Sequence, residues 1–132
     1  MMQSDRVGRL SRGKVLALTA LLLGACAQSP VSGEAAVPEQ FRGEWNADVS
    51  ACGTDLSDTR LEIQANSISF WESSGPLTEI EQPDASELTA TAELSGEGEV
   101  WTERLHFRLS PDGRTLTDLR SGASGFSRRR CP

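Results

Sequence analysis

Apolar and polar residues alternate with a period of two along most of the chain after residue 39. This period places successive side chains on opposite faces of a β-strand. In residues 88–94 leucine and alanine occupy every second position, and residues 101–109 form the longest alternating run. No stretch beyond the N-terminal segment follows the 3.6-residue period of an amphipathic helix. The pattern therefore predicts an all-β domain.

Turn residues divide the alternating region into about eight segments. The expected strands cover residues 41–45, 61–65, 68–72, 77–81, 88–94, 101–109, 116–120 and 126–131. Gly75-Pro76 is expected to interrupt the chain, and Ser110-Pro111-Asp112-Gly113 is a strong turn sequence. Short strands in chain order predict a small antiparallel meander that forms a closed or nearly closed barrel, because closure removes exposed sheet edges. We expect side chains to fill most of its interior.

The N-terminal segment has a different pattern. Basic residues between Arg6 and Lys14 precede an apolar run of nine residues, Val15–Leu23, which is too short to cross a bilayer as a helix. The order of a basic and an apolar region is typical of a secretory signal peptide, whose apolar part is expected to be helical. Leu23-Gly24-Ala25-Cys26 follows directly and matches the bacterial lipobox.

The lipobox predicts cleavage before Cys26 and lipidation of this cysteine. We expect a signal peptide over residues 1–25, a lipidated Cys26 with a flexible tether over 26–38, and a barrel domain over 39–132. Ala27, in place of an aspartate, favours the outer membrane, with the domain facing the periplasm. The alternative is an ordinary signal peptide cut before Gln28, which would leave a soluble periplasmic or secreted protein.

Charge is distributed unevenly along the chain. After cleavage before Cys26, 18 acidic and 9 basic residues would remain, a formal charge of −9. Residues 26–103 hold 16 acidic residues and 2 arginines, whereas residues 104–132 hold 2 acidic residues and 7 arginines. The acidic balance argues against a nucleic-acid partner. The polarity suggests that the C-terminal strands pair with the earlier ones. The alternative is a surface that presents two oppositely charged faces to ligands.

Cys52 and Cys131 are the only cysteines that remain after lipidation of Cys26. An even pair in a small exported domain predicts a structural disulfide. It would close a loop of 80 residues, which is worth about 4.5 kcal/mol in the chain-entropy model.

Gly43-Glu44-Trp45 resembles the GxW element of lipocalin-type barrels. In that element a tryptophan closes the barrel floor and an arginine from the last strand packs over its ring, a cation–π contact. The resemblance implies architecture only. Among the arginines at positions 128–130, Arg128 is the expected partner of Trp45, because it shares a strand face with Phe126.

Glu72 shares a strand face with Ile68 and Phe70 in the predicted third strand. Three interpretations stay open: a binding-site acid, a partner for an arginine inside the barrel, or a strand end that reaches solvent.

Few residues offer chemistry for catalysis or metal binding. The chain has one histidine, His106, and no G-x-S-x-G motif. Zinc would require ligands that are absent, and Asp55–Asp58 and Glu79–Glu87 lack EF-hand spacing. We therefore expect no metal, no cofactor and no enzymatic activity.

The domain as a whole resembles a group of small lipoproteins from alphaproteobacteria of the sphingomonad type. The features that carry the resemblance are Phe41-x-Gly43-x-Trp45, Cys52, Ile68-x-Phe70-Trp71-Glu72-Ser73, Gly96-Glu97-Gly98 with Trp101, and Arg130-Cys131. Many members have tyrosine where this chain has Trp71. The group has no assigned activity, so the resemblance implies location and fold only.

Two functions follow as hypotheses. The first is a monomeric, non-catalytic binding module on the outer membrane that takes a small ligand or an envelope protein at one barrel end. The second is an inhibitor of a basic cell-wall-degrading enzyme, for which the acidic stretch 79–103 would be electrostatically complementary.

Overall fold

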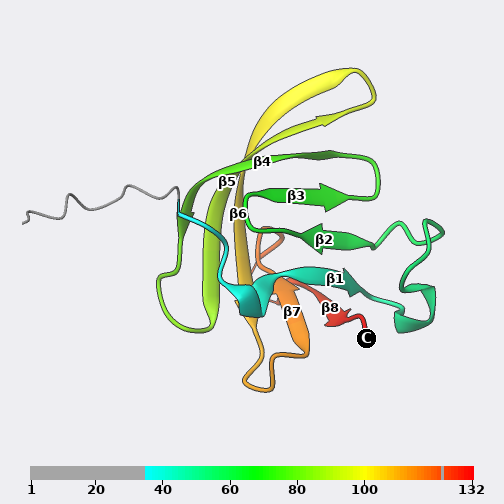
Figure 1. Cartoon of the computed structure of the whole chain (residues 1–132), viewed down its shortest axis with the longest axis vertical. Helices are drawn as coiled ribbons and strands as arrows, with labels where there is room; N and C mark the ends of the chain where they lie inside the picture. The colour runs from blue at the N-terminus through cyan, green and yellow to red at the C-terminus, as the bar shows by residue number, and fades with distance from the viewer. Residues whose placement is uncertain (1–34, 123) are drawn as a thin grey trace, which may run out of the picture. The chain divides into compact units, whose positions relative to one another are not determined.

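Eight antiparallel strands follow one another around a closed barrel, and β1 pairs with both β2 and β8 (Figure 1). This computed structural model describes residues 35–122 and 124–132. The expected signal helix, the lipidated Cys26 and most of the tether lie outside the described residues. Within the described ranges, no helix is long and apolar enough to span a bilayer.

The elements follow the alternating pattern closely. They are η1 (Glu39–Phe41), β1 (Gly43–Asn46), η2 (Val49–Ala51), β2 (Leu61–Ile63), β3 (Ser67–Phe70), β4 (Ser74–Glu81), β5 (Glu87–Gly96), β6 (Glu99–Leu109), β7 (Thr115–Asp118) and β8 (Phe126–Arg130). The predicted all-β meander and its closure are confirmed. Phe41 lies in the 3-10 helix η1 rather than in the first strand.

The core fills the barrel between its two ends. Every second residue of β5, from Leu88 to Leu94, is at most 2% exposed. Leu105 and Phe107 of β6 meet them from the neighbouring strand. The buried apolar residues all lie between Val37 and Leu116, so residues 32–132 contain their own core, as an independently folding domain must.

Gly75-Pro76 does not interrupt the chain, contrary to the sequence-based expectation. Both residues lie inside β4, where Pro76 pairs with Ser67 and Gly75 pairs with Ile68. A Cβ at position 75 would lie 1.7 Å from the Glu93 carbonyl oxygen of β5. The glycine is therefore required by the close approach of the β4 and β5 backbones.

The barrel has two unlike ends, because odd-numbered strands all run in one direction and even-numbered strands in the other. We call the end at which β1 begins the floor. The end at which β1 ends and β2 begins is called the open end. The hairpin of β5 and β6, which contains the two longest strands, extends past the shorter β1–β3 at the open end (Figure 1).

Candidate functional site

The floor is closed by Trp45 and an arginine from the last strand. The Trp45 indole is fully buried and donates from Nε1 to the Phe41 carbonyl oxygen at 3.0 Å. Arg130 stacks on the ring, with its Cζ 4.1 Å from the centroid. Its guanidinium also donates to three backbone carbonyl oxygens, those of Gln40, Arg42 and Gly113.

Arg130, not Arg128, is therefore the partner of Trp45, and our expectation for Arg128 is wrong. The two arginines do share one face of β8, as strand alternation requires. The register decides between them, because Trp45 pairs with Arg130 whereas Arg128 pairs with Leu116 of β7.

The backbone conformation at Gly43 explains why the GxW element begins with glycine. Its φ of +110° lies in a region that favours glycine. A Cβ there would lie 3.5 Å from Nη1 of Arg130, an ordinary van der Waals distance, so the backbone conformation and not lack of space favours glycine. The floor is thus a structural plug of side chains and backbone carbonyls.

The open end carries two arginines, Arg120 and Arg128, whose contacts differ from those of Arg130 at the floor. Arg120, in the connection after β7, forms ion pairs with Asp118 at 2.5 Å and with Glu103 of β6 at 2.5 Å. It also stacks on Phe70 of β3, 5.1 Å from the ring centroid. Three strands separate β3 from β7 in either direction around the barrel, so Arg120 spans the open end.

Arg128 is the other arginine at the open end. It is only 8% exposed. Its Nε donates to the carbonyl oxygen of Thr59, in the connection before β2, at 2.7 Å. Its Cζ lies 4.7 Å from the centroid of the Phe126 ring.

The two guanidinium groups differ electrostatically. Burial acts to lower the pKa of Arg120, but hydrogen bonds and charge from Asp118, with those of Glu103, raise it above its ordinary value. Burial lowers the pKa of Arg128, and the charge of Asp118 opposes this shift only in part. Arg120 is therefore fully compensated by carboxylates, whereas Arg128 is not.

Exposed large apolar side chains lie at the same end, on loops and strand ends. They are Leu56 (89% exposed), Trp71 (50%), Val100 (68%), Trp101 (38%) and Phe126 (41%). The Trp71 indole donates to the Asp55 carbonyl oxygen at 3.3 Å, which joins the β3–β4 connection to the β1–β2 connection. Phe126 was expected on the core side and instead lies at the rim, where the strand begins.

Glu72 does not face the barrel interior, because β3 ends at Phe70 and Glu72 lies in the exposed connection that follows. The strand-face expectation is wrong here, and the interpretation as a solvent-reaching residue holds. Within the described residues Glu72 forms no ion pair. Its carboxylate therefore lies at the surface next to Trp71, outside the barrel interior.

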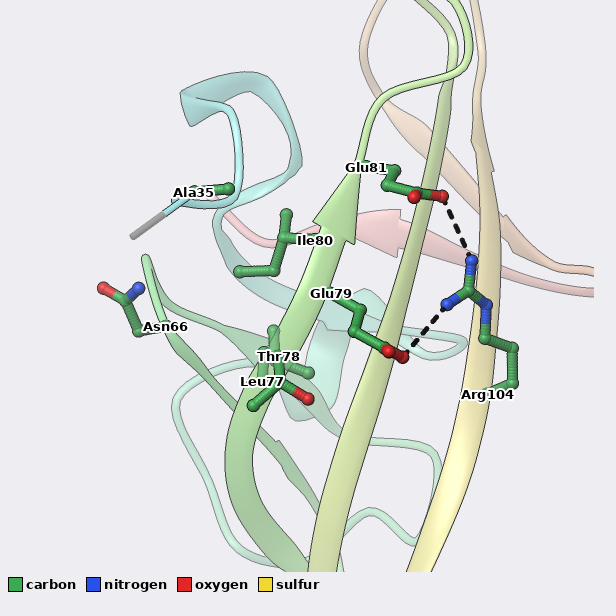
Figure 2. A pocket seen from close by; sticks show the side chains of 8 residues that line it. All are labelled: Ala35, Asn66, Leu77, Thr78, Glu79, Ile80, Glu81 and Arg104. Atoms are coloured by element: carbon green, nitrogen blue, oxygen red, sulfur yellow. Dashed lines mark hydrogen bonds and ion pairs between the residues drawn. The ribbon is translucent and has the colours of Figure 1, made fainter. Parts of the chain in front are cut away.

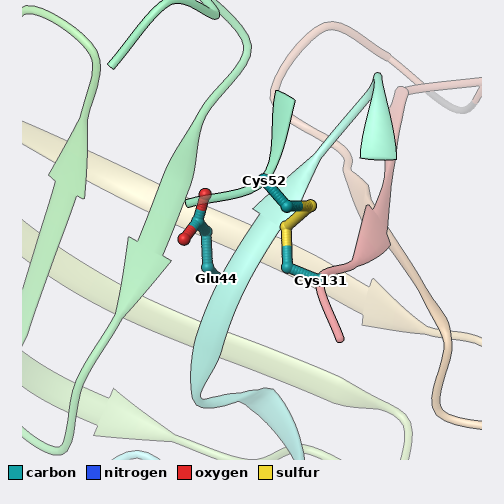
Figure 3. A group of neighbouring side chains, drawn as sticks. All are labelled: Glu44, Cys52 and Cys131. Atoms are coloured by element: carbon teal, nitrogen blue, oxygen red, sulfur yellow. A yellow bond between two sulfur atoms is a disulfide. The ribbon is translucent and has the colours of Figure 1, made fainter. Parts of the chain in front are cut away.

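Cys52 and Cys131 form the predicted disulfide, with Cα atoms 5.6 Å apart. Glu44 lies beside both sulfur atoms, and Figure 3 shows the three side chains together. Two sulfurs bonded to each other are not thiolate ligands. Glu44 is also engaged, since it accepts from the Gly53 amide at 3.0 Å and lies 3.5 Å from Nε of Arg60. This cluster is therefore structural.

A surface pocket of about 380 Å³ lies beside β4. Figure 2 shows Glu79 and Glu81 both directed at Arg104, with oxygen–nitrogen distances of 3.5 and 3.2 Å. Strict alternation would place Glu79 and Glu81 on the same buried face as Leu77. A register shift between Thr78 and Glu81, with the positive φ of Glu79, 48°, instead leaves both carboxylates exposed. Their charges are directed at one another in an exposed site, so this pocket is a weaker candidate than the open end.

The sequence pointed to Trp45 and the two cysteines, but the clustering at the open end could not be found from it. Arg120 carries no motif, and its contact with Phe70 of β3 depends on barrel closure. No family model, curated protein or solved structure matches this chain.

Proposed function

We propose that this chain is a non-catalytic binding module, lipid-anchored at the periplasmic face of the outer membrane, and that its open end is the binding surface. The anchor rests on the lipobox that ends at Cys26 and on the resemblance to small alphaproteobacterial lipoproteins. The binding surface rests on the structure of the barrel ends.

The observation that carries the proposal is the contrast between these ends. The floor is plugged by Trp45 and Arg130. The open end instead exposes aromatic and aliphatic side chains. Exposed apolar patches that are bordered by polar groups are typical of interaction sites. Trp71 and Trp101 offer large, rigid contact area of the kind enriched in binding sites.

A partner protein with a basic surface is the second candidate, and the β5–β6 hairpin favours it. Glu93, Glu97 and Glu99 are all exposed on this hairpin, next to exposed Val100. Acidic groups around an apolar tip complement a basic protein and would accelerate its association. A basic cell-wall-degrading enzyme fits this description.

Photo-crosslinking in living cells tests the binding surface. A photoreactive phenylalanine analogue is placed at Leu56 or Val100 in the full chain, and at Ser127 on the outer face of β8 as a control. We expect specific crosslinked products from the two open-end positions and none from Ser127. Equal crosslinking from all three positions would contradict the proposal. A crosslink to a protein whose yield falls when isolated membranes are irradiated at high salt would favour the basic partner.

Metabolic labelling tests the anchor. Radiolabelled palmitate is expected in the full-length protein and not in the Cys26→Ser variant, because the thiol is the acylation site. Label that persists in the variant would contradict lipidation at Cys26.

A further inference from the structure

The buried guanidinium of Arg128 lacks a carboxylate partner. Its Nε has the Thr59 carbonyl oxygen, but across the described ranges no carboxylate lies within 4 Å of the group and no acceptor is bonded to Nη1 or Nη2. A charged group in such a position is costly unless an opposite charge or further acceptors complete its environment.

Solvent still reaches the two terminal nitrogens. Fully buried side-chain atoms without a partner occur, among the described residues, only in Asn46 and Arg60. Nη1 and Nη2 of Arg128 are therefore accessible, although the residue is only 8% exposed. A molecule that approaches from the open end can reach them.

The neighbouring acids do not fill this role. Asp118 and Glu103 are both bonded to Arg120. They remain close enough for the charge of Asp118 to act on Arg128. Repulsion from these carboxylates grows with the charge of the ligand, so it is weaker for a singly charged anion than for a doubly charged one. A planar carboxylate can in addition accept two parallel hydrogen bonds from the guanidinium fork.

We propose that Nη1 and Nη2 of Arg128 bind the carboxylate of an amphipathic ligand whose apolar part lies on Phe126 and the other exposed apolar residues of the open end. This inference rests on the proposed function and adds the chemical class that the binding surface recognises. The ligand carries one negative charge next to an aromatic or aliphatic group.

Benzoate and its uncharged analogue benzamide test the proposal on the purified domain, residues 32–132. NMR spectra of the ¹⁵N-labelled domain report the Nε–H of Arg128 and the indole N–H of Trp101 directly, so the first measurement needs no variant. We expect benzoate to shift both signals with saturation and benzamide to leave them in place. Inorganic phosphate is expected to compete weakly.

Two charge-conserving variants locate the site. Arg128→Lys keeps the charge and loses the planar fork, so benzoate affinity should fall about tenfold or more. Arg129→Lys is the matched control, because Arg129 is the adjacent exposed residue of the same strand, and its affinity should match that of the native domain.

Absence of a saturable benzoate shift, equal binding of benzamide, or an equal loss in both variants would each overturn the inference. Crosslinks from Leu56 and Val100 that persist in that case would leave the proposed function intact. Where benzoate does bind, its ability to abolish those crosslinks identifies the natural carboxylate as a group of the partner protein. Crosslinks that survive benzoate identify a separate small ligand.

Discussion

Three consecutive arginines of β8 show how strongly position determines what one residue type does. Arg128 is buried at the open end, Arg129 is exposed on the outer face, and Arg130 lies at the floor. Arg130 combines a stacked indole with hydrogen bonds to backbone carbonyls of η1, of Arg42 just before β1, and of the β6–β7 turn. It joins segments that lie far apart in the sequence.

Arg130→Ala should therefore destabilise the domain by about 2–4 kcal/mol, from the lost cation–π contact and charge-assisted hydrogen bonds. Arg129→Ala should change stability by about 0.5 kcal/mol or less, as exposed substitutions usually do. Arg130→Lys should restore part of the loss, since lysine keeps the charge but not the planar ring contact. Urea unfolding midpoints measure all three, and equal midpoints for the two alanine variants would contradict this role of Arg130.

The sequence predicted the face of these residues but not their partners. Strand alternation places positions 128 and 130 together, and this is correct. The choice of partner for Trp45 depends on the register between β1 and β8, which is fixed by loops and packing far from both strands. The prediction that Glu72 shares a strand face with Ile68 and Phe70 failed for a related reason. The alternation of side chains does not indicate where a strand ends, and β3 ends at Phe70.

The β5–β6 hairpin, which joins the two longest strands, has a strained turn. The two central residues, Glu97 and Gly98, have φ values of +50° and +82°. Positive φ at both positions is the signature of a type I′ turn, which prefers Asn-Gly. A glutamate in this conformation carries a backbone cost that asparagine largely avoids.

Glu97→Asn should consequently stabilise the domain by about 0.5–1 kcal/mol. Glu99→Asn is the matched control, because it removes the same charge from the same hairpin at a position without positive φ. Thermal unfolding compares the two. A gain in the control equal to that in Glu97→Asn would assign the effect to charge instead of backbone conformation.

At the scale of the whole molecule, the uneven charge of the sequence is resolved within the fold. Arg104 and Arg108 of β6 pair with Glu81 of β4 and Glu87 of β5. Hydrogen bonds from His106 and then Arg108 lower the pKa of Glu87. Arg104, Arg108 and Arg120 thus form ion pairs with acidic residues that precede them in the chain, as the charge pattern predicted, whereas Arg128 and Arg130 do not. The contacts of Arg120 with Asp118, Glu103 and Phe70 at the open end could not be predicted from the charge pattern, because they form only when the barrel closes.

The Cys52–Cys131 bridge acts on the same scale, since its cysteines are 79 residues apart. Reduction should lower the free energy of unfolding by about 2–5 kcal/mol, chiefly through the greater freedom of the unfolded chain. Urea unfolding with and without reductant measures this loss. The double variant Cys52→Ser, Cys131→Ser should start lower and show no further response to reductant. A native domain that is insensitive to reductant would contradict the prediction.

Closure of the barrel through β8 also has a consequence for biosynthesis. The strand that completes the ring and the cysteine that completes the bridge both lie in the last seven residues, from Phe126 to Pro132. Until these residues have been synthesised and exported, β1 and β7 keep unpaired edges that can join strands of other chains. The β5–β6 hairpin, whose contacts are local, can form earlier. Final assembly must therefore await the synthesis and export of β8 and Cys131, and a chain truncated before Phe126 should be held by chaperones or aggregate.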